Sequence, residues 1–112
     1  MKAIVLFLLL PTMVIIVGCV RQQVDYTRRA SAVCELHRIS MAKTNVPIEY
    51  GLIRLSEWGR ALKTASSNSF PHAEVDVLGG CIVDTPTRAV IYVCGQCQGA
   101  RQKWESENPP PQ

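Results

Sequence analysis

Two short pairs of metal-type ligands lie far apart in this chain of 112 residues, and they constrain its fold more than any other feature. Cys34 and His37 form a C-x-x-H pair, and Cys94 and Cys97 form a C-x-x-C pair. A two-residue spacing lets both side chains of a turn face one tetrahedral ion. A fold that joins the two pairs as a Cys₃His set would tie the beginning of the domain to its end.

The segments between the pairs predict a mixture of strand and helix. Residues 46–51 form a short extended segment, which Pro47 places at a sheet edge or in a loop. Apolar residues then recur at helical spacing and predict an amphipathic helix of about three turns. They are Leu55, Trp58, Leu62 and Ala65.

The second half of the domain predicts a hairpin and a final helix. Residues 75–83 and 88–94 are rich in β-branched side chains and flank a turn at residues 84–87, which indicates a β-hairpin. Cys97 then opens a helix that runs to about Glu107. This order resembles zinc-ribbon and treble-clef modules, in which the second ligand pair starts a terminal helix whose dipole favours thiolates. We therefore expect a small α+β, zinc-ribbon-like domain with one β-hairpin, two helices and a structural zinc ion.

The N-terminal residues have the composition of an export signal. Lys2 precedes an apolar stretch over residues 4–17, which is interrupted by Pro11. The stretch is shorter than the roughly 20 residues of a membrane-spanning helix and fits the core of a signal peptide.

The apolar stretch ends in Ile16-Val17-Gly18-Cys19, which resembles the lipobox of bacterial lipoproteins. The resemblance implies that Cys19 becomes the lipidated N-terminus of the mature protein and is anchored to membrane lipid by more than one acyl chain. Val20 follows in place of Asp, which resembles the pattern of lipoproteins released to the outer membrane. The alternative is an ordinary signal peptide or an uncleaved anchor.

Composition divides the chain into four parts. Residues 1–18 form the predicted lipoprotein signal peptide, and residues 19–31 form a lipidated N-terminus and a polar tether. Residues 32–107 form the zinc-ribbon-like domain, and the proline-rich residues 108–112 form a disordered tail.

Charge and motifs argue against nucleic-acid binding and catalysis. Without Lys2 and the apolar stretch, the chain carries eleven basic and nine acidic residues, too even a balance for a nucleic-acid surface. The sequence contains no phosphate-binding loop, no serine-nucleophile motif and no carboxylate pair. His72 is expected to be solvated, and Trp58 and Trp104 to anchor their helices in the core. We expect a protein that is not an enzyme.

Disulfide bonds are the alternative to a metal ion, because exported proteins meet an oxidising compartment. In the predicted hairpin, Cys81 would lie about 13 Å from Cys94, and a disulfide requires Cα atoms within about 7 Å. Cys81 is therefore expected to be a buried thiol, or a ligand recruited late. A strand followed by C-G-x-C and a helix also describes the thioredoxin active site, but too few residues follow Cys97 to complete that fold.

Several strings together resemble a family of small, mostly uncharacterised bacterial zinc-ribbon-like proteins. They are C-x-x-H at residues 34–37, V-P-I-x-Y-G at 46–51, F-P-x-A at 70–73, G-G-C at 79–81 and V-C-x-x-C at 93–97. The resemblance covers nearly all of the folded part. Family members often have Pro where Gly95 stands here, a difference that leaves the ligand positions intact.

These observations predict a lipid-anchored protein of the bacterial cell envelope, in the outer membrane and facing the periplasm. Its domain would bind structural zinc through Cys34, His37, Cys94 and Cys97 and would interact with an envelope protein that the sequence does not identify. The first alternative is a lipoprotein of the same topology stapled by disulfides. The second is a thiol-redox or metal-handling envelope protein.

Overall fold

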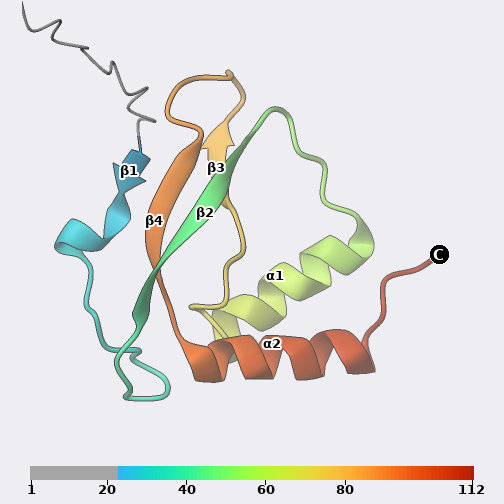
Figure 1. Ribbon diagram of the computed structural model, residues 1–112. Coiled ribbons are helices and arrows are strands. Elements are labelled where there is room, and N and C mark those ends of the chain that lie inside the picture. Colours follow the sequence, from blue (N-terminus) through green and yellow to red (C-terminus); the bar gives the residue numbers. More distant parts are fainter. Residues whose placement is uncertain (1–22) are drawn as a thin grey trace, which may run out of the picture.

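The computed structural model describes residues 23–112, so the predicted signal segment 1–18 and the predicted lipidation site Cys19 lie outside the described residues. The described chain is a small α+β domain with two α-helices, as predicted, but its sheet has four strands and not the single predicted hairpin (Figure 1). The elements are β1 (Gln23–Asp25), the 3₁₀-helix η1 (Tyr26–Arg29), β2 (Ala42–Tyr50), α1 (Glu57–Ser69), β3 (Val77–Gly80), β4 (Arg88–Val93) and α2 (Gly95–Glu107). Among the described residues no helix is both long and apolar enough to span a bilayer.

The predicted hairpin between residues 75–83 and 88–94 is wrong. The strand order is β1-β4-β2-β3, in which β4 pairs antiparallel with β2 and parallel with β1, while β3 pairs parallel with β2. Strand β2 is long enough to pair with β4 along one edge and with β3 along the other. Its buried Val46 and Ile48 pack against Ala89 and Ile91 of β4, so that burial selects β2 as the partner of β4.

Pro47 lies inside a central strand and not at the sheet edge that its residue type predicts. Its neighbour Ile48 donates its backbone N–H to the Thr87 carbonyl at 2.9 Å, on the β4 side. Backbone N–H groups alternate sides along a strand, so position 47 would donate toward β3. The pairing with β3 begins only at Ile48, opposite Val77, and the missing N–H of Pro47 therefore leaves no carbonyl without a donor.

The second half of the predicted tether belongs to the fold. Strand β1 extends the sheet at β4, with Gln23 opposite Arg88. Asp25 then caps η1 by accepting the backbone N–H of Thr27 at 2.8 Å, and Thr27 is buried. The predicted start of the folded part at residue 32 is therefore wrong, because the short and polar sequence of β1 did not indicate a strand.

Both predicted helices form, and they lie side by side below the sheet (Figure 1). The Ser56 hydroxyl caps α1 by accepting the Gly59 N–H at 3.0 Å. Trp58 of α1 and Trp104 of α2 are half-buried, with ring centroids 5.9 Å apart, and the ring of Phe70, the residue that follows α1, lies 6.5 Å from that of Trp104. Phe70, Met41 and Ala73 form one core cluster together with the three buried cysteines.

Candidate metal centre

The first ligand pair lies in a tight turn that follows η1. Cys34 accepts the backbone N–H of Arg38 at 2.8 Å through its carbonyl and donates its own N–H to the Ile39 carbonyl at 2.9 Å. Arg38 adopts a left-handed backbone conformation with φ of 58°, which reverses the chain immediately after His37. A single bridge between Val33 and Ser40 closes the turn at its base.

The second pair spans the junction of β4 and α2. Cys94 is the N-cap residue of α2, and Cys97 lies in the first helical turn. Strand β4 thus carries Cys94 to one end of the sheet, and the helix places Cys97 beside it. The N–H of Cys94 donates to the His72 carbonyl at 2.9 Å, which also fixes the loop after α1 against this junction.

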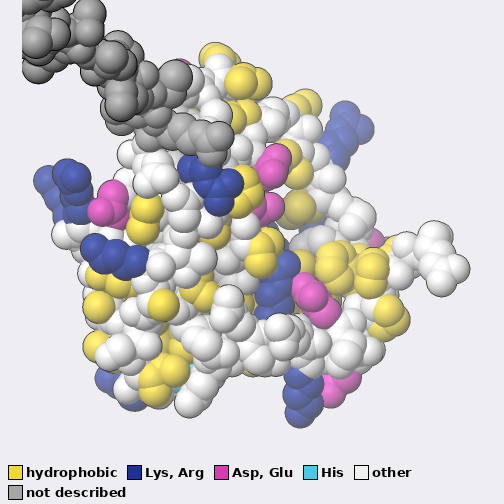
Figure 2. Space-filling model, in the orientation of Figure 1, with side chains coloured by type: hydrophobic (Ala, Val, Ile, Leu, Met, Phe, Trp, Pro, Cys, Tyr) yellow, Lys and Arg dark blue, Asp and Glu magenta, His cyan; other side chains and the backbone are white. Residues whose placement is uncertain are grey.

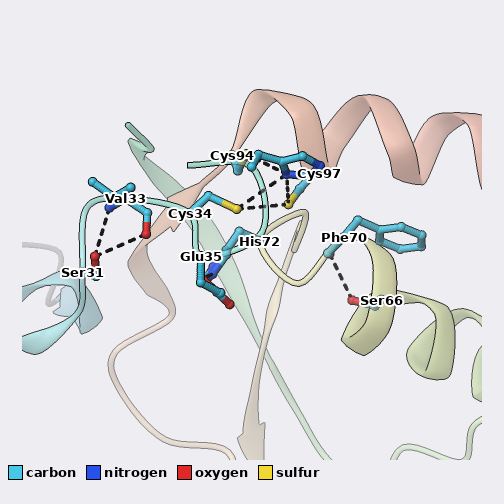
Figure 3. A network of polar contacts seen from close by, with 10 residues as sticks. Ser31, Val33, Cys34, Glu35, Ser66, Phe70, His72, Cys94 and Cys97 are labelled. Atoms are coloured by element: carbon cyan, nitrogen blue, oxygen red, sulfur yellow. Dashed lines mark hydrogen bonds and ion pairs between the residues drawn. The ribbon is translucent and has the colours of Figure 1, made fainter. Parts of the chain in front are cut away.

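The two pairs meet as predicted, with one ligand atom of each residue within 4.8 Å of the others. The Nδ1 atom of His37 lies 3.6 Å from the sulfurs of Cys34 and Cys94. It lies 3.4 Å from the sulfur of Cys97, and the sulfurs of Cys34 and Cys97 are 3.8 Å apart (Figure 3).

Hydrogen bonding does not account for this cluster. An imidazole nitrogen has either one hydrogen or one lone pair, so Nδ1 of His37 cannot bond to three sulfurs at once. Four ligand atoms that all lie within 4.8 Å of one another are instead typical of the ligands around an ion. Cys34, His37, Cys94 and Cys97 could therefore hold a metal ion together.

The surroundings of Cys34 and Cys97 have opposite effects on the two thiols. Burial acts to raise the pKa of Cys34, but backbone N–H groups of His37 and Leu36 and side-chain hydrogen bonds from His37 and Cys94 hold that pKa at about 6. Burial raises the pKa of Cys97 to about 12, and its hydrogen bonds with Cys34 and Cys94 act in the same direction. N–H groups directed at the first cysteine of a turn favour its thiolate, the form that binds metals.

The cluster is closed to solvent on the cysteine side. Cys34, Cys94 and Cys97 are fully buried, while His37 is half-buried. All four coordinating positions of a tetrahedral ion would thus be filled by protein, with no position for a substrate.

The structure corrects two predictions about residues near the site. His72 is not solvated: its Nε2 lies 2.6 Å from a carboxylate oxygen of Glu35, in the ligand turn, and its side chain is 27 % exposed. The carboxylate of Glu35 has a lowered pKa, chiefly because it accepts its own backbone N–H and next because of this contact with His72. The residues around His72 gave no indication of this contact, because its partner Glu35 lies 37 positions away in the sequence.

The second correction concerns Cys81, which is exposed and not buried. It follows β3 in the loop to β4, away from the four-ligand cluster, so the prediction that it lies outside that cluster is confirmed. The burial prediction is wrong, because Cys81 lies in the loop after β3 and not in a strand that pairs with β4.

Comparison with known proteins adds no relationship: no protein-family model, curated protein or solved structure matches this chain.

Proposed function

We propose that this protein is a cell-envelope lipoprotein whose zinc-ribbon-like domain is held together by a structural zinc ion and serves in binding, without catalysis. The observation that supports the zinc part of the proposal is the set of distances within the Cys₃His cluster, whereas the lipoprotein part rests on the sequence around Cys19 alone. A tetrahedral zinc ion, with bonds of about 2.3 Å to sulfur and about 2.0–2.1 Å to nitrogen, separates two sulfurs by about 3.8 Å and a sulfur from nitrogen by about 3.5–3.6 Å. Here the sulfurs of Cys34 and Cys97 are 3.8 Å apart and Nδ1 of His37 lies 3.4–3.6 Å from the three sulfurs, while all four ligand atoms lie within 4.8 Å of one another.

The kind of ligand also supports zinc. Three thiolates and one imidazole form a soft donor set of the type that selects zinc over magnesium or calcium. Sites with four protein ligands are structural, whereas catalytic zinc sites keep one position for water or substrate. The ion would join the turn after η1 to the start of α2 and so stabilise a small domain.

Metal content tests the zinc site. The full chain, expressed in a bacterium and extracted from the membrane in detergent, is expected to contain about one zinc ion per chain. His37→Ala and Cys97→Ser are expected to lose most of it, and Cys81→Ser, the matched control, to keep it. A metal-free chain, or His37→Ala with a full zinc content, would refute the proposed centre.

The lipid anchor at Cys19 is tested separately, by incorporation of labelled palmitate. Incorporation is expected in the unchanged chain and is expected to be lost in Cys19→Ser. Incorporation that persists in Cys19→Ser would remove the lipoprotein assignment and leave the zinc site unaffected.

A disulfide staple is the second candidate, and one distance favours it. The sulfurs of Cys34 and Cys97 are 3.8 Å apart, and a disulfide between them requires an approach to about 2.05 Å. An isolated chain without metal, lighter by the mass of two hydrogens per disulfide, would support this candidate. The redox alternative has less support, because all three clustered sulfurs are buried from a thiol partner.

A further inference from the structure

Four aliphatic side chains project into solvent from loops and strand ends of the sheet. Leu52 is 80 % exposed, Leu78 62 %, Ile82 82 % and Val83 78 %. We name these four the apolar loop face. We propose that this face enters the interfacial layer of the bilayer to which Cys19 is anchored, an inference that rests on the proposed lipid anchor.

The topology places these residues near one end of the sheet, where Leu78 lines a hollow beside α1 and Ile82 lines another beside Tyr26. Tyr50, the last residue of β2, lies opposite Gly80, the last residue of the parallel strand β3. Arg88, the first residue of β4, lies opposite Pro47 near that same end of β2. The loops that start at Gly51 and at Cys81 therefore leave the sheet together, as in Figure 1, and Figure 2 shows hydrophobic side chains gathered at this end.

The chain enters the domain at this end as well. Gln23, the first residue of β1, lies opposite Arg88 at the start of β4. Only residues 20–22 separate Gln23 from Cys19, so the chain between the two spans at most about 14 Å even when fully extended. A lipid on Cys19 would therefore keep the apolar loop face near the membrane surface and would not leave the domain free to move away.

The charge of the loops indicates apolar contact and not electrostatic attraction. Residues 51–56 contain one basic side chain, Arg54, and residues 81–87 contain one acidic side chain, Asp84. Because these charges balance, docking is expected to depend on buried apolar area, with little effect of salt or of anionic lipid.

The same geometry sets the position of the Cys₃His cluster. Cys94 follows the far end of β4, about 20 Å along the strand from Arg88. When the apolar loop face is in the bilayer, the cluster and α2 face away from it, toward a partner in the periplasm.

Cys81 provides a natural reporter for the test, because it is the only exposed cysteine among residues 23–112 and is adjacent to Ile82. The full lipidated chain is reconstituted into phosphatidylcholine vesicles, and Cys81 is labelled with a thiol-reactive fluorophore. Lipids brominated near the headgroup are expected to quench this label. In the control chain, Cys81→Ser with Lys103→Cys on α2, the label is expected to remain unquenched. The quenching at Cys81 is expected to be insensitive to salt.

A double substitution at exposed positions tests whether the apolar side chains themselves make the contact, and it leaves the core unchanged. Ile82→Ser with Val83→Ser is expected to reduce the quenching at Cys81 at least about two-fold, because it removes apolar area from the contact. Equal quenching at positions 81 and 103, or none at 81, would overturn the inference. Fluorescence that changes with the protein-to-lipid ratio and not with brominated lipid would assign the face to a second copy of the chain and would also overturn it. The mass of the same sample shows whether Cys19 is lipidated, so a failure of the anchor is distinguished from a failure of docking.

Discussion

The sulfur of Cys34 lies 3.8 Å from the sulfur of Cys97, although 63 positions separate the two residues in the chain. This contact joins the turn after η1 to the first turn of α2. Strands β2, β3 and β4 lie between these two turns in the sequence. The two thiols differ in acidity, with a pKa of about 6 for Cys34 and about 12 for Cys97. These pKa values favour a Cys34 thiolate and a protonated Cys97 thiol at neutral pH in the metal-free chain.

This difference in acidity predicts how zinc binding depends on pH. Protons compete with zinc for sulfur, so the association constant is expected to rise with pH. Near pH 7 Cys34 is already ionised, whereas Cys97 must still release a proton when zinc binds. Below about pH 6 Cys34 must release one as well, and the slope of log K against pH should steepen by about one proton.

A competition titration against a chelator between about pH 5 and pH 8 measures that slope. Cys81→Ser, which alters an exposed thiol outside the cluster, is expected to reproduce the curve of the unchanged chain. A slope that is constant, or that becomes shallower toward acid, would contradict the assignment of Cys34 as the acidic thiol.

Phe70 is predicted to be a major source of stability in the core beside the Cys₃His cluster. Its side chain is 1 % exposed and lies against Trp104, with ring centroids 6.5 Å apart. Phe70→Ala is expected to lower the free energy of unfolding by about 3–5 kcal/mol, because it removes buried apolar area and leaves a cavity. Denaturant unfolding of the zinc-loaded chain measures this change.

Leu52→Ala serves as the matched control for Phe70→Ala. Leu52 is also a large apolar residue but is 80 % exposed, so its truncation is expected to change the free energy of unfolding by less than about 0.5 kcal/mol. Similar losses in the two variants would mean that the core is not centred on Phe70.

Gly79 is predicted to be required for the pairing of β2 with β3. A Cβ atom at this position would collide with the ring of Tyr50 and the side chain of Ile48. Gly79→Ala is therefore expected to destabilise the fold by about 1–3 kcal/mol, as other overpacked sites do. Thermal unfolding of the zinc-loaded chain is the measurement.

The control for Gly79→Ala is Gly99→Ala, on α2, where an added Cβ atom meets open space. Alanine in a helix interior is expected to stabilise the chain by about 0.5–1 kcal/mol relative to glycine. The packing argument at Gly79 fails if both variants shift the melting temperature in the same direction.

Local sequence patterns were sufficient to predict the two helices and the members of the Cys/His cluster. Helix α1 is set by features that lie close together in the sequence. They are the periodic apolar residues from Trp58 to Ala65 and the hydroxyl of Ser56 that caps the helix. The spacing of Cys34 with His37, and of Cys94 with Cys97, likewise predicted that each pair shares a turn, and the structure brings the two turns together.

Strand partners could not be predicted in the same way, because they depend on long-range burial. The residues of β3 and β4 have the composition of strands, but nothing local shows that both pair with β2. The residues of β1 have the polar composition of a spacer, and only the pairing of Gln23 with Arg88 shows that they form a strand. The contact of His72 with Glu35 depends on the same arrangement and was therefore missed as well.

X-ray absorption at the zinc edge, on the chain isolated from the membrane with its metal, tests the central claim most directly. The account predicts three sulfur neighbours at about 2.3 Å and one nitrogen neighbour at about 2.0–2.1 Å from the zinc ion. His37→Ala is expected to lose the nitrogen neighbour or the ion itself. A zinc ion surrounded only by oxygen and nitrogen, or no zinc in a correctly folded chain, would contradict it.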